Sequence, residues 1–215
     1  MPGCRLGTYH FEKYNKNYVY VQMPESKCKI FLRCVIFLTI KGTDKPDEFA
    51  IVHRFNKKLG GPTDKNNWEP IKGQVEDKER RAGQRLAGKE HDALLNEVLR
   101  YTIYREVEEE AKIHPCSISN LKFHPEIAYT SRHGNYPEAG MHFQYMFFTG
   151  EISRKDFEVA QAKVHDMYLD PRTMNLRKDE REKNGLSLWS KRKGGSALMG
   201  GPAGAMVRLY MRNFG

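Results

Sequence analysis

The apolar run at residues 30–40 (IFLRCVIFLTI) is rich in β-branched and aromatic residues, and it predicts a buried strand. The turn-forming segment KGTDKPDE follows, so we expect residues 49–55 (FAIVHRF) to return as an antiparallel strand. Residues 56–67 are polar with a Gly-Gly-Pro break and predict a loop, and residues 68–75 predict a short strand. This stretch therefore predicts the beginning of a sheet.

A helical pattern runs from Asp92 to Lys112, and His114-Pro115 is expected to end it. Residues 76–90 (EDKERRAGQRLAGKE) are highly charged, and we interpret them as an inserted loop or a frayed helical segment. The apolar side of the helical pattern recurs at spacings of three and four, at Leu94, Leu95, Val98, Leu99, Thr102, Ile103 and Val107.

Strands and helices alternate again in the second half of the chain. Residues 121–140 predict a strand and a loop, and Met141–Thr149 (MHFQYMFFT) predicts another strand. Lys155–Asp166 predicts a helix whose apolar side carries Phe157, Ala160 and Val164. The order strand, strand, loop, helix, strand, helix indicates an α+β fold or a mixed α/β/α layering.

The C-terminal part is strongly basic. Residues 172–193 hold eight Lys/Arg against three Asp/Glu and few apolar groups, so they predict an exposed basic loop. Two roles are open for this run: guiding an RNA chain, with Trp189 stacking on a base, or forming a disordered tail. The glycine-rich residues 200–204 are a flexible joint or a helix entry, and Ala205–Phe214 predicts a short terminal amphipathic helix.

The charge balance points to polyanionic partners. The 215-residue chain has a formal net charge of +9 and a pI near 9.3, which favours nucleic acid, phosphorylated small molecules or acidic membrane surfaces as partners. The plainer interpretation is a basic protein with none of these partners. The apolar run Phe31–Ile40 is interrupted by Arg33 and is too short to span a bilayer.

The cysteines and the N-terminus bear on the compartment. Cys4, Cys28, Cys34 and Cys116 form no C-x-x-C pair, and we interpret them as thiols in a reducing compartment, with a Cys28–Cys34 disulfide as the alternative. Met1–Val21 is polar and lacks an apolar core of about 7–15 residues, as a secretory signal would have. These features favour a cytoplasmic or nuclear location unless a leader has been removed.

The segment with most chemical information is Arg105-Glu106-Val107-Glu108-Glu109-Glu110. On a helix, Glu106, Glu109 and Glu110 lie at i, i+3 and i+4 and share one face. Like charges at this spacing repel by roughly 0.2–0.5 kcal/mol per pair, whereas a divalent cation would make the same spacing favourable. Carboxylates are the ligands that Mg²⁺ and Mn²⁺ prefer. The plainer interpretation is a solvated acidic face softened by Arg105 and Lys112.

In its wider context this cluster resembles the Nudix box, G-x5-E-x7-R-E-U-x-E-E-x-G-U, in which U is aliphatic. Trp68 and Pro70 resemble the family's W-x-x-P-x-G lead-in, and the resemblance covers about residues 30–148. The second half of the box matches as Glu97-x7-Arg105-Glu106-Val107-x-Glu109-Glu110-x-x-Ile113, and Gly73 matches the opening glycine.

The resemblance implies a Nudix-type α/β/α sandwich with a mixed central sheet. It divides the chain into an N-terminal extension packing on the domain (1–29), a hydrolase domain (30–170) and a basic C-terminal segment (171–215) with the possible terminal helix.

Two departures from the family pattern stand out. Glu79 has the right distance from Gly73, but 25 residues separate it from Arg105 where the box has seven. We infer an insertion of about 18 residues within residues 78–96, which either lengthens the catalytic helix or forms a lid. Whether Glu79 or Glu97 is the first glutamate of the box stays open, with the spacing favouring Glu97. At the position of the family's late glycine this chain has Lys112, which costs about 1 kcal/mol of stability if a left-handed turn is required there.

The resemblance also implies a mechanism. Glu106, Glu109 and Glu110 would bind Mg²⁺ or Mn²⁺ with a backbone carbonyl near Gly73, and Glu97 would complete the shell or order a water. Arg105 resembles the family arginine that orients a neighbouring carboxylate. Water would attack phosphorus, helped by metal ions that lower its pKa and neutralise developing charge. Glu138, with Glu126 as the other candidate, would be a general base outside the box.

The substrate follows less directly. Lys72, Arg54 and Tyr136 are the candidate substrate-binding residues, with Lys72 as a point charge for a phosphate and Tyr136 among the aromatic residues that could stack on a base. The segment Pro70-Ile71-Lys72-Gly73 resembles the lead-in of mRNA-decapping enzymes and dinucleoside tetraphosphate hydrolases, shifted by one residue. We expect capped or 5′-polyphosphorylated RNA or a dinucleoside polyphosphate. The alternatives are a diphosphoinositol polyphosphate or ADP-ribose hydrolase, and a catalytically weak RNA-binding protein of the same fold.

Overall fold

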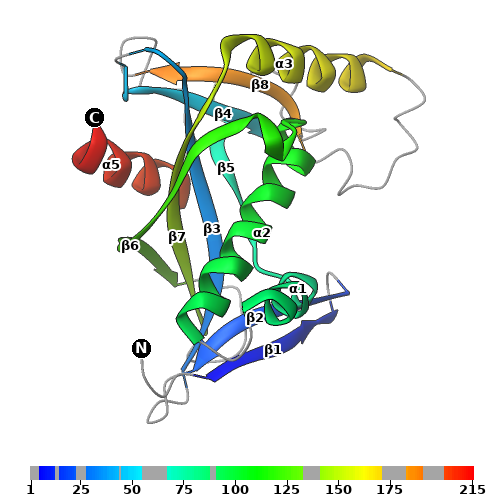
Figure 1. The fold of residues 1–215 in the computed structure, drawn as a ribbon, viewed down its shortest axis with the longest axis vertical. Helices are drawn as coiled ribbons and strands as arrows, with labels where there is room; N and C mark the ends of the chain where they lie inside the picture. Colours follow the sequence, from blue (N-terminus) through cyan, green and yellow to red (C-terminus); the bar gives the residue numbers. More distant parts are fainter. Residues whose placement is uncertain are drawn as a thin grey trace. The chain divides into compact units, whose positions relative to one another are not determined.

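The computed structural model describes residues 5–12, 15–22, 28–43, 45–54, 67–87, 91–132, 141–170, 183–190 and 201–215 (Figure 1). The elements are β1 (Arg5–Phe11), β2 (Lys16–Gln22), β3 (Lys29–Ile40), β4 (Glu48–Arg54), β5 (Trp68–Gln74), α1 (Asp77–Ala87), α2 (His91–Ala111), the 3-10 turn η2 (Pro115–Ser117), β6 (Ile118–Arg132), β7 (Met141–Ile152), α3 (Arg154–Leu169), β8 (Lys183–Ser190) and α5 (Pro202–Phe214). The α+β class expected from the sequence is confirmed.

The chain divides into two compact units. The first contains Met1–Val35, Lys72–Tyr104 and Phe123–Phe148, and the second contains Ile36–Ile71, Arg105–Lys122 and Thr149–Gly215. Several strands and helix α2 contribute residues to both units. Each unit is described by itself below.

In the first unit, β1 and β2 form an antiparallel hairpin, and β2 pairs antiparallel with β3 through Tyr20 and Phe31. The sequence patterns did not predict this hairpin, which occupies most of the proposed N-terminal extension (1–29). Aromatic rings hold it to the core, since the rings of Phe11 and Phe31 lie 5.1 Å apart and those of Phe31 and Phe143 lie 5.5 Å apart. Such pairs add to the free energy of burying the rings.

In the second unit, β4 is the central strand. It pairs antiparallel with β3 at Phe49, with β5 at Ile51 and with β8 along its whole length. Because β3 and β5 both run antiparallel to β4, their own pairing is parallel, and the sheet is mixed as expected. Helix α3 packs along β8 (Figure 1), and its buried residues are the expected Phe157, Ala160 and Val164.

Helix α5 confirms the expected terminal helix, beginning at Pro202 and thus earlier than expected. Tyr210 stacks on Phe37 with 4.1 Å between ring centroids, and its hydroxyl donates to the carbonyl of Pro46 at 2.8 Å. Burial, with the nearby Asp47 carboxylate, raises the pKa of Tyr210 to about 12. Of the glycine-rich residues 200–204, Gly201 caps the start of α5 and residues 202–204 form its first turn, so the described part is a helix entry.

The expectation of an exposed basic loop over residues 172–193 is wrong for its central part. Residues 183–190 form β8, in which Leu186 and Trp189 are buried. Trp189 packs on Phe49, with ring centroids 5.0 Å apart, so it is a core residue and does not offer a face to a base. The run of residues 172–193 has few apolar residues among many charges, so its sequence pattern does not indicate a strand. The strand is stabilised instead by its pairing with β4, which the sequence pattern does not reveal. Residues 171–182 and 191–200 lie outside the described residues.

Within the charged segment at 76–90 and the expected insertion at 78–96, residues 77–87 and 91–96 are helical. Helix α1 occupies residues 77–87, so the loop alternative is wrong, and α2 already begins at His91. Gly83 makes the crossing of these helices possible: a Cβ there would come within 2.7 Å of a Val98 methyl group. The described parts of the segment thus contain α1 and the N-terminal end of α2, and their status as an insertion stays a prediction.

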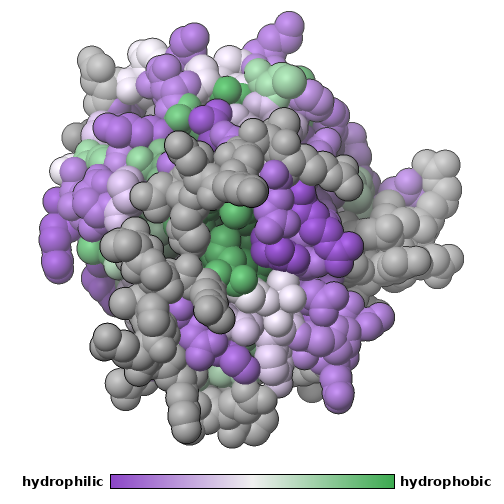
Figure 2. Space-filling view, turned by 60° about the horizontal axis from the view of Figure 1, so that its bottom comes forward, coloured by the Kyte–Doolittle hydropathy of each residue, from purple (hydrophilic) through white to green (hydrophobic). Residues whose placement is uncertain are grey.

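The described thiols and surface agree with the composition. Cys28, Cys34 and Cys116 form no disulfide, so the Cys28–Cys34 alternative is wrong. Among the coloured residues on the face in Figure 2, hydrophilic side chains predominate and a smaller apolar patch lies in a hollow near the centre, in keeping with a mean hydropathy of −0.72. Among the described residues, no helix is both long and apolar enough to cross a bilayer.

Candidate active site

The last turn of α2 ends in the way that the Nudix pattern requires. Lys112 has a φ of +57°, the left-handed conformation that the family's glycine would adopt without strain. The amide of Ile113 donates to the carbonyl of Val107 at 3.1 Å, which closes the helix end. The Lys112 ammonium donates a hydrogen bond to the carbonyl of Glu109 at 2.8 Å. This bond satisfies one of the last carbonyls of the helix, which have no amide donor within the helix. The expected strained position is therefore present.

Glu106 and Glu110 lie on the buried side of this last turn. They are 7% and 5% exposed, and the neighbouring Val107 and Ala111 are fully buried and fix that side of the helix against the core. The Glu109 side chain is half exposed. Three carboxylates at a helix C-terminus face the negative end of the helix dipole, and α2 has no basic residue in its last turn. This arrangement costs stability, so it needs a compensating cation.

Arg105 supplies one such cation. Its Nη1 donates to Glu106 Oε1 at 2.7 Å and to Glu109 Oε2 at 2.8 Å. The guanidinium is 14% exposed and therefore sits in a partly desolvated position, where charge-assisted hydrogen bonds are strongest. The contact joins Arg105 to two of the three clustered carboxylates, and its role in orienting them stays a prediction.

Lys183 supplies a second cation, which the sequence patterns did not predict. Its Nζ lies 2.6 Å from Glu69 Oε1 and 2.8 Å from Glu110 Oε1, and all three side chains are at most 5% exposed. Glu69 follows Trp68 in the expected lead-in, so the start of β5 and the end of α2 meet through this lysine. The six side chains of Glu69, Glu106, Glu109, Glu110, Arg105 and Lys183 carry two net negative charges, a balance that one divalent cation would neutralise.

Next to Lys183 lies a second buried polar pair. His53 Nδ1 and Asn184 Oδ1 are 2.5 Å apart, and both residues are at most 2% exposed. Trp68 packs edge-on against the His53 ring at 5.0 Å. Among the described residues, the Asn184 Nδ2 group has no hydrogen-bond partner, an uncommon state for a buried amide.

The other expected site residues fall elsewhere. Arg54 is exposed at the end of β4 in the second unit. Lys72 and Gly73 in β5, and Glu97 in α2, belong to the first unit and are partly exposed. Their participation in the site stays a prediction. Glu138 and Tyr136 lie outside the described residues.

Two further glutamates from the sequence interpretation lie in the first unit. The Glu126 side chain is 65% exposed and lies 3.3 Å from His124 Nδ1. Glu79 is 4% exposed, and its carboxylate accepts the backbone amide of Glu76 at 2.7 Å, which caps the start of α1. This capping contact gives Glu79 a structural role at the start of α1.

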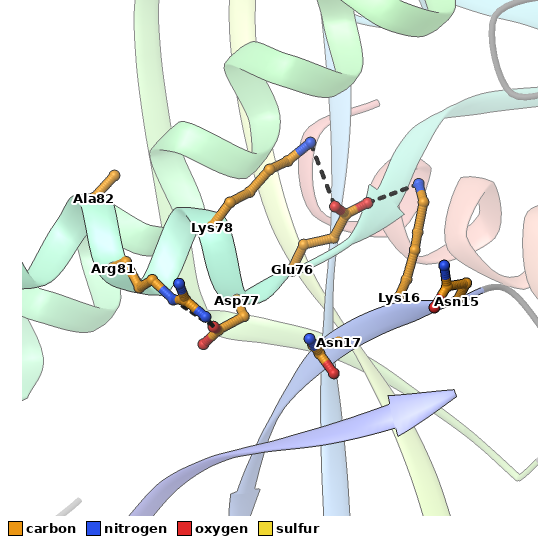
Figure 3. A pocket seen from close by; sticks show the side chains of 8 residues that line it. All are labelled: Asn15, Lys16, Asn17, Glu76, Asp77, Lys78, Arg81 and Ala82. Atoms are coloured by element: carbon orange, nitrogen blue, oxygen red, sulfur yellow. Dashed lines mark hydrogen bonds and ion pairs between the residues drawn. The ribbon is translucent and has the colours of Figure 1, made fainter. Parts of the chain in front are cut away.

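The first unit also contains a pocket of about 460 Å³ at the start of α1 (Figure 3). Glu76 lies between two ammonium groups there, Lys16 at 2.9 Å and Lys78 at 3.3 Å. Asp77 pairs with Arg81 at 2.6 Å. The charged groups that line this pocket are thus paired with one another, and none of the expected site residues lines the pocket.

The residue types at the end of α2 fit an oxygen-preferring divalent cation. Among the described residues, however, no three His, Cys, Asp or Glu side chains close around one point. The carboxylates face Arg105 and Lys183 instead, so they would have to turn from these cations to meet an ion. Carboxylate side chains on a helix have the rotamers for such a turn.

Comparison with known proteins gives similarity in structure alone. No protein-family model and no curated protein sequence matches the chain. Among solved structures, it is similar to an Ap4A hydrolase from C. elegans, with 15% identity over 86% of this chain and 96% of that one and a TM-score of 0.42. It is also similar to the E. coli ORF135 protein, with 12% identity over 88% and 94% of the two chains and a TM-score of 0.45.

A mutT/nudix family protein from Listeria innocua has 12% identity over 89% of this chain and 95% of that one, with a TM-score of 0.41. It is named for the family that the glutamate motif resembles. At identities of 12–15%, these similarities do not assign a function to the chain. A functional proposal has to rest on the chain's own residues.

Proposed function

We propose that this protein is a Nudix-type hydrolase that uses a divalent metal ion to cleave a phosphoanhydride bond in a nucleoside polyphosphate. The observation that supports it best is the pair of buried carboxylates, Glu106 and Glu110, on one side of the last turn of α2. Buried carboxylates at a helix C-terminus oppose the dipole and repel each other. A site for a divalent cation is a reason to keep them, and the sequence from Glu97 to Ile113 resembles the second half of the box except at Lys112.

In this proposal Glu106, Glu109 and Glu110 hold Mg²⁺ or Mn²⁺, with the Gly73 carbonyl as a further ligand. When bound, such an ion activates water and neutralises charge on the phosphate oxygens. Arg105 contacts both Glu106 and Glu109 and so holds two of the proposed ligands side by side on the last turn of α2. Glu97 orders a water, and Glu138, or else Glu126, accepts a proton from it.

The proposed substrates are capped or 5′-polyphosphorylated RNA and dinucleoside polyphosphates. The net charge of +9 supports a polyanionic substrate. Lys72 and Arg54 are the proposed contacts to phosphate, and Tyr136 is the proposed contact to a base. Diphosphoinositol polyphosphates and ADP-ribose are the competing substrates; the first also needs a basic pocket, whereas the second does not specifically call for a net charge of +9.

The test is a panel of turnover assays with Mg²⁺ or Mn²⁺. The panel contains capped RNA, triphosphorylated RNA, a dinucleoside tetraphosphate, a diphosphoinositol polyphosphate and ADP-ribose. We expect turnover of an RNA or dinucleoside substrate that chelation of the metal abolishes. Turnover of the diphosphoinositol compound or ADP-ribose alone would keep the hydrolase and replace its substrate.

A pair of variants assigns the activity to the cluster. Glu109→Gln should lower turnover by roughly 100-fold or more, the scale for losing one charge-stabilising group at a reacting centre. Glu108→Gln is the matched control, because Glu108 is exposed on the same turn and makes the same change of charge. Equal activity in both variants would contradict the proposed site. Retention of RNA without any turnover would favour the catalytically weak RNA-binding protein.

A further inference from the structure

Lys183 stands out among the described lysines because its side chain is buried. The side chain is 1% exposed, whereas lysine is almost never fully buried unless it is paired. Its placement follows from a β-bulge: His53 pairs with Gly185 and Arg54 with Lys183, which leaves Asn184 without a partner in the ladder. Bulges redirect side chains and are frequent beside active sites.

The two carboxylates that meet Lys183 come from different elements of the second unit. Glu69 lies in β5 and Glu110 in the last turn of α2, and one ammonium bridges them with contacts of 2.6 Å and 2.8 Å. A divalent cation bridging two carboxylates would use the same oxygens. The ammonium therefore stands where it can compensate for charge that a metal would otherwise neutralise.

Stability alone is a weak reason for this arrangement. Desolvating three charged groups is expensive, and apolar replacements of buried ion pairs are often neutral or stabilising. Glu110 belongs to the proposed ligand set, and a metal ion on the same Oε1 would stand next to the ammonium, where the two positive charges repel each other. Lys183 and the ion therefore compete for that oxygen.

Resting on the proposed function, we infer that Lys183 is a resident counter-cation of the metal site, which occupies Glu110 in the metal-free protein and competes with the divalent ion. Its single charge holds Glu69 and Glu110 in place before the ion arrives. When the ion binds, Glu110 exchanges the ammonium for the metal, and Glu69 keeps the lysine. Lys183 therefore lowers the affinity for the metal and limits the number of ions that the cluster retains.

The test measures Mn²⁺ binding to the full chain by titration calorimetry and by the loss of the electron paramagnetic resonance signal of free Mn²⁺. Lys183→Met should raise the affinity for Mn²⁺ roughly tenfold or more, because a positive charge in contact with a ligand disappears. Lys112→Met is the matched control: it removes a positive charge whose ammonium donates to the backbone carbonyl of Glu109, and it should change the affinity less than about threefold.

A second comparison covers the case in which Lys183→Met does not fold. Glu69→Gln and the double variant Glu69→Gln/Lys183→Met differ only in the lysine, and the double variant leaves one carboxylate fewer to be compensated. The double variant should again bind Mn²⁺ roughly tenfold more tightly than Glu69→Gln alone.

Unchanged or weaker Mn²⁺ binding on removal of the lysine, in either comparison, overturns the inference. The same result with metal-dependent turnover intact in the unaltered protein leaves the proposed hydrolase standing and makes Lys183 a structural residue. Absence of Mn²⁺ binding in every variant, together with no turnover, removes both proposals.

Discussion

Two helix ends of this protein carry groups of carboxylates, and they are stabilised in different ways. Glu76, Asp77 and Glu79 stand at the N-terminal end of α1, where the helix dipole attracts negative charge. Lys16, Lys78, Arg80 and Arg81 pair with them. Glu106, Glu109 and Glu110 stand at the C-terminal end of α2, where the dipole repels negative charge.

The difference shows how to separate a structural cluster from a functional one. At α1, local rules of helix capping and surface pairing explain every carboxylate. At α2, the same residue type opposes the local rules, and its compensation comes from Arg105 and from Lys183, a residue far along the chain. Violations of local rules are expected at functional sites. We therefore expect α1 carboxylates to matter for folding and α2 carboxylates to matter for metal binding.

The largest effect on stability from this comparison should come from the start of α1. Asp77→Asn should lower the free energy of unfolding at pH 7 by about 1–2 kcal/mol, because the amide loses the attraction of the dipole and the charged hydrogen bonds from Arg80 and Arg81. Urea unfolding followed by circular dichroism measures it. Asp166→Asn, exposed on α3, is the control and should stay within about 0.5 kcal/mol of the unaltered protein.

The pH dependence of this difference sharpens the prediction. Burial opposes the ionisation of Asp77, but the hydrogen bonds from Arg80 and Arg81 outweigh it and hold the pKa of that carboxyl below its usual value. A carboxyl with a lowered pKa stabilises the fold above its unfolded pKa, about 4, and the contribution is lost as the pH falls through the folded value. The difference in the free energy of unfolding between the unaltered protein and Asp77→Asn should be constant above about pH 5 and shrink below about pH 4. A gap that persists unchanged to pH 2 would show that the ionised carboxylate is not its source.

A smaller effect is expected where α2 ends. Lys112 is left-handed, so Lys112→Gly should unfold at a higher urea concentration than Lys112→Ala, with a difference of about 1 kcal/mol. Both variants lose the ammonium contact to the Glu109 carbonyl, so the pair isolates the backbone strain. Greater stability of the alanine variant would mean that the turn does not need the left-handed conformation.

The sequence predicted those parts whose signal is local. The apolar run of β3, the periodicity of α2 and the three buried residues of α3 appear where their patterns put them, because burial on one face leaves a period in the sequence. The glutamate spacing on α2 and the left-handed position at Lys112 were also readable, since both depend on neighbours within one or two turns.

The parts that failed depend on contacts between distant residues. Strand β8 lies within a basic run, and only its pairing with β4 and the packing of Trp189 on Phe49 make it a strand. Lys183 looked like one more surface charge for the same reason. The alternation of Leu186, Leu188 and the neighbouring polar residues was the one local signal that could have revealed the strand.

The most direct measurement of the central claim is Mn²⁺ binding to a pair of variants that each exchange one carboxylate for an amide. Glu106→Gln, at the end of α2, should weaken Mn²⁺ binding roughly tenfold or more, whereas Asp77→Asn, at the start of α1, should bind Mn²⁺ as the unaltered protein does. Equal binding by Glu106→Gln and the unaltered protein would contradict the account, as would weaker binding by Asp77→Asn alone.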